Sequence, residues 1–201
     1  MQAGLAVMVA LLMPLAFSCD GRYPGDDRMP DVGNTYCYYY IWKYFVPDQL
    51  TPKSLGANSL AFSITGKEVF DLDHDPETFR QLALEHGDRG DSLMLIVPLP
   101  IEGLPCWMQS MNVISVSEAG DTVDVSSTFK LFYFTFRHES SIIYGPAVDI
   151  PVDSLTTEHL MWMAPKTLVV HTADDQPLAD SLKYTLLIAV KDRKGLAIDI
   201  N

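Results

Sequence analysis

The closely spaced carboxylates of Asp71–Glu77 are the densest group of residues that could take part in chemistry. Alternating carboxylates supply the oxygen ligands that Ca²⁺ prefers. As an EF-hand loop the run fails at two positions, because Pro76 stands where Gly is needed and Leu82 stands where the bidentate Glu belongs. We therefore predict a solvent-exposed turn in which Asp75 caps a helix, and no metal site.

The other polar residues do not form a pattern typical of a catalyst. The five histidines stand apart and form no H-x-H, H-x-x-x-H or H-E-x-x-H spacing that would bring two ring nitrogens to one metal. The sequence also contains neither a nucleophile elbow of the G-x-S-x-G type nor a glycine-rich phosphate loop. We therefore expect no catalytic residues and no cofactor, and we do not expect an enzyme. The histidines are His74, His86, His138, His159 and His171.

The aromatic-rich run from Tyr36 to Phe45 is a candidate binding surface. Aromatic side chains have a high propensity for strands, and exposed rings favour carbohydrate faces and protein interfaces. Such a run is also compatible with a strand that is half core and half edge. The candidate platform consists of Tyr36, Tyr38, Tyr40, Trp42 and Tyr44.

The N-terminus has the pattern expected of a targeting signal. An apolar stretch, Leu5–Phe17, precedes Ser18 and Cys19, and polar residues follow. The stretch has about the length of a secretory signal and is too short for a comfortable transmembrane helix. It resembles a bacterial lipoprotein signal peptide, which implies that residues 1–18 are removed and that Cys19 is lipidated. An ordinary signal peptide cut near Ser18, or a buried N-terminal helix, are the alternatives.

The segment 19–34 is rich in Gly, Pro, Asp and Arg and is expected to be a flexible tether. The leader, the tether and a domain of short strands together resemble envelope lipoproteins of Gram-negative gut anaerobes, many of which belong to families of unknown function. The resemblance implies a cell-envelope location, with the chain held to the outer membrane through the lipid on Cys19.

If Cys19 is lipidated, Cys37 and Cys106 remain as a candidate disulfide pair in an oxidising compartment. Such a bridge would close a loop of about 70 residues and contribute roughly 4 kcal/mol in the chain-entropy model. Two buried free thiols are the alternative, because free cysteine behaves as a small hydrophobic residue.

The formal net charge of −12 argues against a nucleic-acid partner, because the phosphate backbone attracts basic proteins. The negative charge of the chain also favours a domain that is held away from an anionic lipid surface over one that lies flat on it.

Short strands with frequent turns predict one β-rich domain over residues 35–201: a β-sandwich, immunoglobulin-like or related, with one or two short helical insertions. A helix is expected to begin at Pro76, after the Asp75 cap, and to end at His86-Gly87. A hairpin around Asp192–Gly195, with Gly195 in the left-handed conformation, is expected at the C-terminus. The expected strands include Leu60–Ile64, Val113–Ser117, Thr122–Val125, Phe129–Phe136, Thr167–Thr172, Leu182–Val190 and Leu196–Ile200.

The function expected from these features is that of a lipid-anchored envelope protein that binds a glycan, a peptide or a partner protein. The competing hypothesis is a structural or accessory subunit of a surface assembly or uptake complex. An envelope hydrolase is a third and weaker hypothesis.

Overall fold

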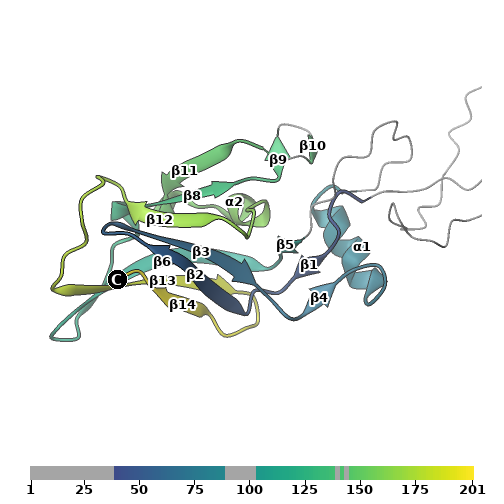
Figure 1. Ribbon diagram of the computed structural model, residues 1–201. Helices are drawn as coiled ribbons and strands as arrows, with labels where there is room; N and C mark the ends of the chain where they lie inside the picture. Colours follow the sequence, from purple (N-terminus) through teal and green to yellow (C-terminus); the bar gives the residue numbers. More distant parts are fainter. Residues whose placement is uncertain (1–38, 89–102, 139–140, 143–144) are drawn as a thin grey trace, which may run out of the picture.

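The computed structural model describes residues 39–88, 103–138, 141–142 and 145–201 (Figure 1). Within these residues, two antiparallel sheets form the layers of a β-sandwich, and two short α-helices accompany them. The mostly β fold class predicted from the sequence is confirmed. The predicted signal peptide, Cys19, the tether and Cys37 lie outside the described residues. Within the described part of the chain, no helix is long and apolar enough to cross a membrane.

The larger sheet has the strand order β11-β8-β12-β3-β2, and the smaller one has the order β14-β13-β6-β7. The strands of the larger sheet are β2 (Gln49–Leu55), β3 (Ser59–Thr65), β8 (Phe129–Phe134), β11 (Ala147–Pro151) and β12 (Leu168–Thr172). The strands of the smaller sheet are β6 (Met108–Ser117), β7 (Thr122–Asp124), β13 (Leu182–Val190) and β14 (Leu196–Asp199).

Shorter elements complete the fold. Two-residue strands β1 (Tyr44–Phe45), β4 (Val69–Phe70) and β5 (Leu104–Pro105) form a small sheet of order β4-β1-β5, and β9 (Arg137–His138) pairs with β10 (Ser141–Ile142). The helical elements are α1 (Pro76–Glu85), α2 (Thr157–Met161) and the 3₁₀ turns η1 (Ser126–Thr128) and η2 (Val152–Ser154). Figure 1 shows α1 and the small sheet together at one end of the sandwich.

The core of the sandwich consists of alternate residues on facing strands. Successive side chains of a strand point to opposite faces, so every second residue can be buried. Leu60, Phe62 and Ile64 of β3 are almost fully buried, as predicted from their alternation. Phe129, Leu131 and Tyr133 make the equivalent contribution from β8. This strand lies between β11 and β12, as expected for an interior strand.

Helix α1 begins where the sequence predicts. The Asp75 carboxylate accepts a hydrogen bond from the backbone N–H of Thr78 at 3.1 Å, and Pro76 occupies the first turn. Gly87, which follows the helix end, has a φ of +71°, the left-handed backbone conformation in which helices commonly terminate. The helix buries Phe79, Leu82 and Ala83.

Both predicted hairpins are present. Strands β6 and β7 pair around a turn in which Gly120 has a φ of +88°. Strands β13 and β14 pair with Leu186 opposite Ile198. One detail of the second turn was wrong: Asp192, with a φ of +54°, takes the left-handed conformation predicted for Gly195. Aspartate tolerates this region because its short polar side chain bonds locally.

The proposed aromatic platform needs a correction at Tyr44. This residue is fully buried, and its ring lies 5.6 Å from that of Phe79 and 4.8 Å from that of His86. Tyr44 belongs to β1, which is covered because it is paired on one side with β4 and on the other with β5. Tyr44 is therefore part of the core and does not contribute to an exposed platform.

Of the other proposed platform residues, Trp42 is 39 % exposed and Tyr40 is half-buried. Tyr36 and Tyr38 lie outside the described residues. Trp42 is thus the one platform residue for which the structure shows a substantially exposed ring within the described segment.

Candidate functional site: a cleft beside Trp42

A cleft of about 670 Å³ opens where the small sheet meets the end of the larger one. It is lined by side chains from the segment before β1, from β2 and β3, from the turn after β4 and from the residues before β12. We call it the Trp42 cleft. Its polar and charged lining residues, together with the indole, include Trp42, Lys43, Lys53, Ser63, Thr65, Asp71, Asp73 and Lys166.

Buried neighbours hold Trp42 in place. Ile41 is fully buried, and its backbone N–H donates to a carboxylate oxygen of buried Asp88 at 2.9 Å. On the other side, the Lys43 carbonyl accepts a hydrogen bond from the N–H of Leu104 at 3.0 Å. The segment is therefore fixed on both sides of Trp42, while the indole ring remains accessible.

The cleft also requires a glycine at Gly66. A Cβ added there would lie 1.9 Å from the backbone oxygen of Val46, which no side chain can accommodate. This close approach brings the turn after β3 against the chain leaving β1. The Val46 N–H reinforces the contact by donating to the Glu68 carbonyl at 3.0 Å.

Three lysines approach the cleft from separate parts of the chain. Lys53 lies at the point where the register of β2 shifts, and its ammonium group donates to the carbonyl of Lys166. Lys166 follows Pro165, whose carbonyl accepts a hydrogen bond from the N–H of Ile64 at 2.9 Å. These contacts join the bulge in β2, strand β3 and the start of β12. With Lys43, they concentrate positive charge in a chain whose net charge is −12.

Two carboxylates from the turn after β4, those of Asp71 and Asp73, also line the cleft. Asp71 accepts hydrogen bonds from the N–H groups of Asp73 and His74 at 3.0 and 2.8 Å, and from the His74 ring at 2.8 Å. Burial raises the pKa of Asp71, but the hydrogen bonds from His74 outweigh it and hold the pKa below its ordinary value. Asp71 is therefore an ionised acceptor at neutral pH.

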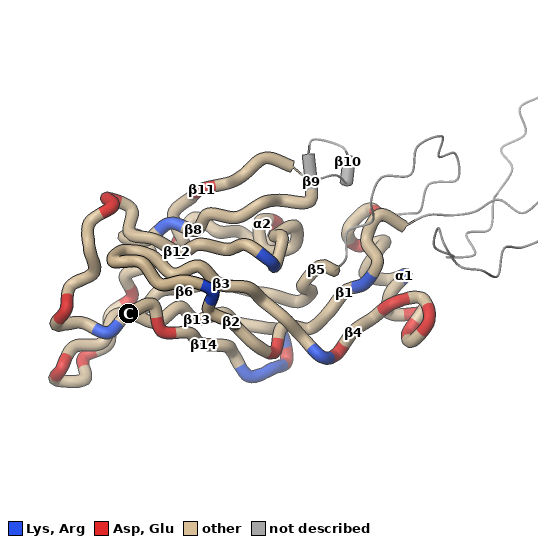
Figure 2. Tube along the Cα trace, viewed as in Figure 1, with Lys and Arg blue, Asp and Glu red and all other residues tan. Residues whose placement is uncertain are grey.

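Figure 2 shows the acidic turn between β4 and α1 as a cluster of red. In the described part of the chain, no three His, Cys, Asp or Glu side chains come together in a geometry that would hold a metal ion.

The chemistry of the cleft is that of a binding site with three kinds of group. Lysine ammonium groups donate hydrogen bonds and carry positive charge, while aspartate oxygens only accept. Ser63 and Thr65 provide hydroxyl groups that can do both. The Trp42 ring offers a flat apolar face.

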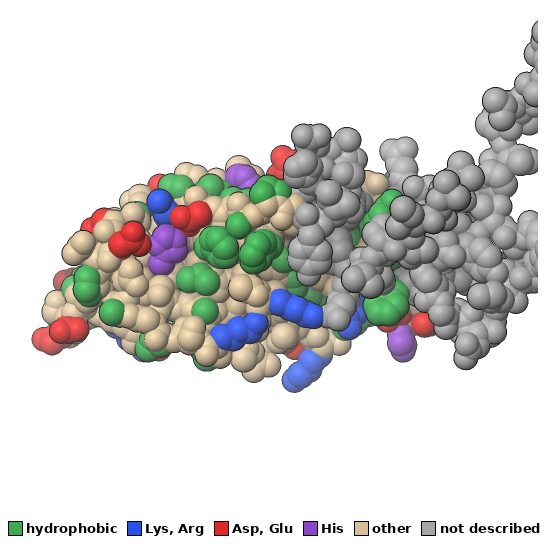
Figure 3. All heavy atoms as spheres, turned by 45° about the horizontal axis from the view of Figure 1, so that its top comes forward, with side chains coloured by type: hydrophobic (Ala, Val, Ile, Leu, Met, Phe, Trp, Pro, Cys, Tyr) green, Lys and Arg blue, Asp and Glu red, His purple; other side chains and the backbone are tan. Residues whose placement is uncertain are grey.

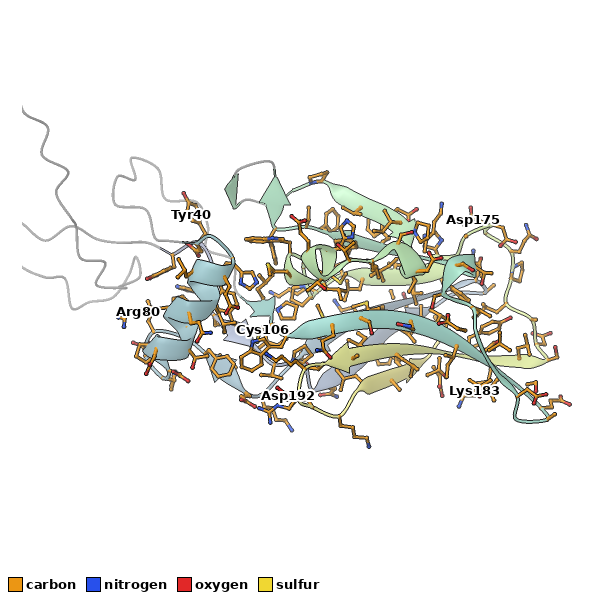
Figure 4. The ribbon with its side chains drawn as sticks, turned by 180° about the vertical axis from the view of Figure 1, so that it is seen from behind. Tyr40, Arg80, Cys106, Asp175, Lys183 and Asp192 are labelled. Atoms are coloured by element: carbon orange, nitrogen blue, oxygen red, sulfur yellow. The ribbon has the colours of Figure 1, made fainter. Side chains whose placement is uncertain are left out.

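Cys106 is a buried free thiol in the structure (Figure 4). Its Sγ donates to the carbonyl of Phe45 at 3.3 Å, and burial raises the pKa of the thiol to about 12. The predicted partner, Cys37, lies outside the described residues, so the disulfide stays a prediction.

His86 is a buried titratable residue at this end of the fold, and its ring contacts the rings of Tyr44 and Trp162. Its Nδ1 lies 2.8 Å from the Leu82 carbonyl, which can only accept, so Nδ1 carries the proton. Burial lowers the pKa of His86, and the hydrogen bond to Leu82 offsets part of that effect. The ring is therefore neutral at pH 7.

The sequence pointed to Trp42 but not to the lysines that share its cleft. Lys43, Lys53 and Lys166 are far apart in the chain and match no motif. Lys53 and Lys166 meet because β2 and the segment before β12 both flank β3 in the larger sheet, whereas Lys43 comes from the segment before β1 of the small sheet. Knowledge of the strand order was needed to find them.

No family model matches the chain, and the comparisons with curated proteins and with solved structures gave no match either.

Proposed function

We propose that this chain is a lipid-anchored envelope protein that binds acidic carbohydrate in the Trp42 cleft. The observation that carries the proposal is the combination of an exposed indole, three lysines, two aspartates and two hydroxyl side chains in one cleft. An acidic sugar can make use of each of these groups. Its carboxylate pairs with lysine, its hydroxyl groups donate to aspartate, and its C–H face packs on an aromatic ring.

The same combination is a poorer fit for other ligands. A neutral sugar makes no use of the lysines, and the ionised side chains of an acidic peptide have no hydroxyl groups to donate to Asp71 and Asp73. The lipid anchor rests on the apolar stretch that ends at Ser18-Cys19. An anchored protein with such a cleft would hold glycan close to the membrane.

The binding proposal is tested by calorimetry with the dimer of galacturonic acid, using the full chain with Cys19→Ala. We expect saturable binding that weakens with added salt, because exposed ion pairs are screened. Trp42→Ala should lower the affinity about tenfold or more, as for a central aromatic contact. Leu84→Ala, which removes an exposed apolar side chain from α1, is the control and should bind like the parent. Equal binding by Trp42→Ala would place the ligand elsewhere and refute the proposed site.

The anchor is tested separately by fractionating cells that express the chain with and without Cys19→Ala. The unmodified chain should sediment with membranes, and the variant should appear in the soluble fraction. Membrane association of the variant to the same extent would contradict lipidation at Cys19.

A further inference from the structure

The outer face of the larger sheet carries an aromatic pair. Because side chains alternate along β8, burial of Phe129, Leu131 and Tyr133 directs Phe132 and Phe134 outward. Their ring centroids are 5.5 Å apart with an interplanar angle of 81°, and Phe134 is 36 % exposed. The pair is thus an apolar feature on the outer face of a chain whose net charge is −12.

The apolar surface extends across the sheet from this pair. Phe132 lies opposite Val169 of β12, and Val169 lies opposite Ala61 of β3. In Figure 3 hydrophobic side chains gather on this face, with basic side chains beside them on one side and a histidine among charged groups on the other. On the same sheet, the ring of His171 on β12 lies 2.9 Å from the carboxylate of Asp149 on β11.

This face is continuous with the Trp42 cleft. The Phe134 carbonyl accepts a hydrogen bond from the N–H of Ala164 at 2.8 Å. The next residue, Pro165, lines the cleft and accepts from the N–H of Ile64 at 2.9 Å. Neighbouring strands lie about 4.8 Å apart, so Phe134 is about 10 Å from Ile64 across the sheet. A chain that fills the cleft can therefore reach the aromatic pair.

The lysines of the cleft, in contrast to the net charge of the whole chain, favour an anionic polymer as the occupant of this extended surface. Lys53 and Lys166 line the cleft, and Lys166 directly follows Pro165 in the segment that hydrogen-bonds to both Phe134 and Ile64. A second copy of this chain would bring another net charge of −12 against the first, which disfavours self-association. The aspartates of the cleft favour a ligand with hydroxyl groups over one with carboxylates alone.

We propose that Phe132 and Phe134 form a second aromatic subsite, so that the protein binds an extended acidic polysaccharide chain across the cleft and the outer face. This rests on the proposed function of the Trp42 cleft. The cleft takes one part of the chain, and the aromatic pair takes sugar rings further along. Affinity should therefore rise with chain length until the ligand spans both subsites.

The test compares the dimer and the octamer of galacturonic acid by calorimetry, using the full chain with Cys19→Ala. The octamer should bind about tenfold more tightly than the dimer. Phe134→Ala should remove most of this gain and leave dimer binding unchanged. Val123→Ala, which truncates another exposed apolar side chain on β7, should bind both ligands like the parent. Thermal melting of each variant verifies that the fold is retained.

The outcomes separate the two proposals. If the dimer binds in a Trp42-dependent way and Phe134→Ala retains the octamer gain, the second subsite is refuted and the cleft stands. If no acidic oligomer binds, both proposals fail. If poly-glutamate binds as tightly as the octamer and with the same dependence on Phe134, the occupant is a peptide and the polysaccharide is refuted.

Discussion

The contact between Asp88 and Ile41 should be important both for stability and for the shape of the cleft. Asp88 is 2 % exposed, and its carboxylate accepts the N–H of fully buried Ile41 at 2.9 Å. The two residues are 47 positions apart, so the bond ties the end of the α1 segment to the chain that carries Trp42. The substitution Asp88→Ala removes this contact.

The expected cost follows from the burial of both partners. A hydrogen bond to a charged group contributes about 1.5–3 kcal/mol, and its loss leaves a buried N–H without this acceptor. We therefore expect Asp88→Ala to lower the free energy of unfolding by about 2 kcal/mol. For a domain of this size such a loss lowers the melting temperature by about 4–8 °C. Asp88→Asn retains an oxygen acceptor without the charge and should lose about half as much.

Differential scanning calorimetry measures the stability effect, and calorimetric titration with the galacturonate dimer measures the effect on the site. The affinity should fall in the order parent, Asp88→Asn, Asp88→Ala, because Ile41 directly precedes Trp42. Asp180→Ala removes an exposed carboxylate and serves as the control. If Asp88→Ala melts at the temperature of Asp180→Ala, the reasoning about this contact is wrong.

Three further predictions concern buried polar groups. The folded pKa of His86 lies below its unfolded value of 6.5, so the free energy of unfolding should decrease as the pH falls through 6.5 toward the folded pKa. The melting temperature of His86→Phe should depend less on pH over that interval. Cys106 should resist alkylation in the folded protein because its thiol is buried and has a pKa of about 12. In the unfolded, non-reduced protein, two reactive thiols at Cys37 and Cys106 would exclude the predicted bridge. Ser126→Ala should cost about 1–3 kcal/mol in urea unfolding, because its Oγ accepts the N–H of buried Val113 at 2.9 Å; an unchanged midpoint would contradict this.

The elements that the sequence predicted correctly depend on local signals. The Asp75 cap, Pro76 and the stop at Gly87 act within a few residues of one another, so helix α1 could be placed from the sequence. The alternation in β3 and β13 likewise reflects a local rule, because one face of each strand must be buried.

The mistakes concern features that depend on neighbours distant in the chain. The aromatic run predicts that Tyr44 belongs to an exposed platform, but β1 is enclosed because β4 and β5 pair with it on both sides. Nothing in the run from Tyr36 to Phe45 reveals those partners. The same reason explains why Trp42, two residues earlier, could not be singled out as the exposed ring.

The two faces of the larger sheet explain how a stable sandwich can also carry exposed aromatic side chains. The buried residues of β3, β8 and β12 lie on the inner face of the larger sheet, so its outer face is not needed for the main core. Aromatic rings on that outer face add little to sandwich packing, yet strand pairing holds their backbone rigidly. A preorganised face of this kind loses little conformational entropy when a ligand binds. This favours a role for Phe132 and Phe134 in binding over a role in folding, and their replacement should change affinity more than stability.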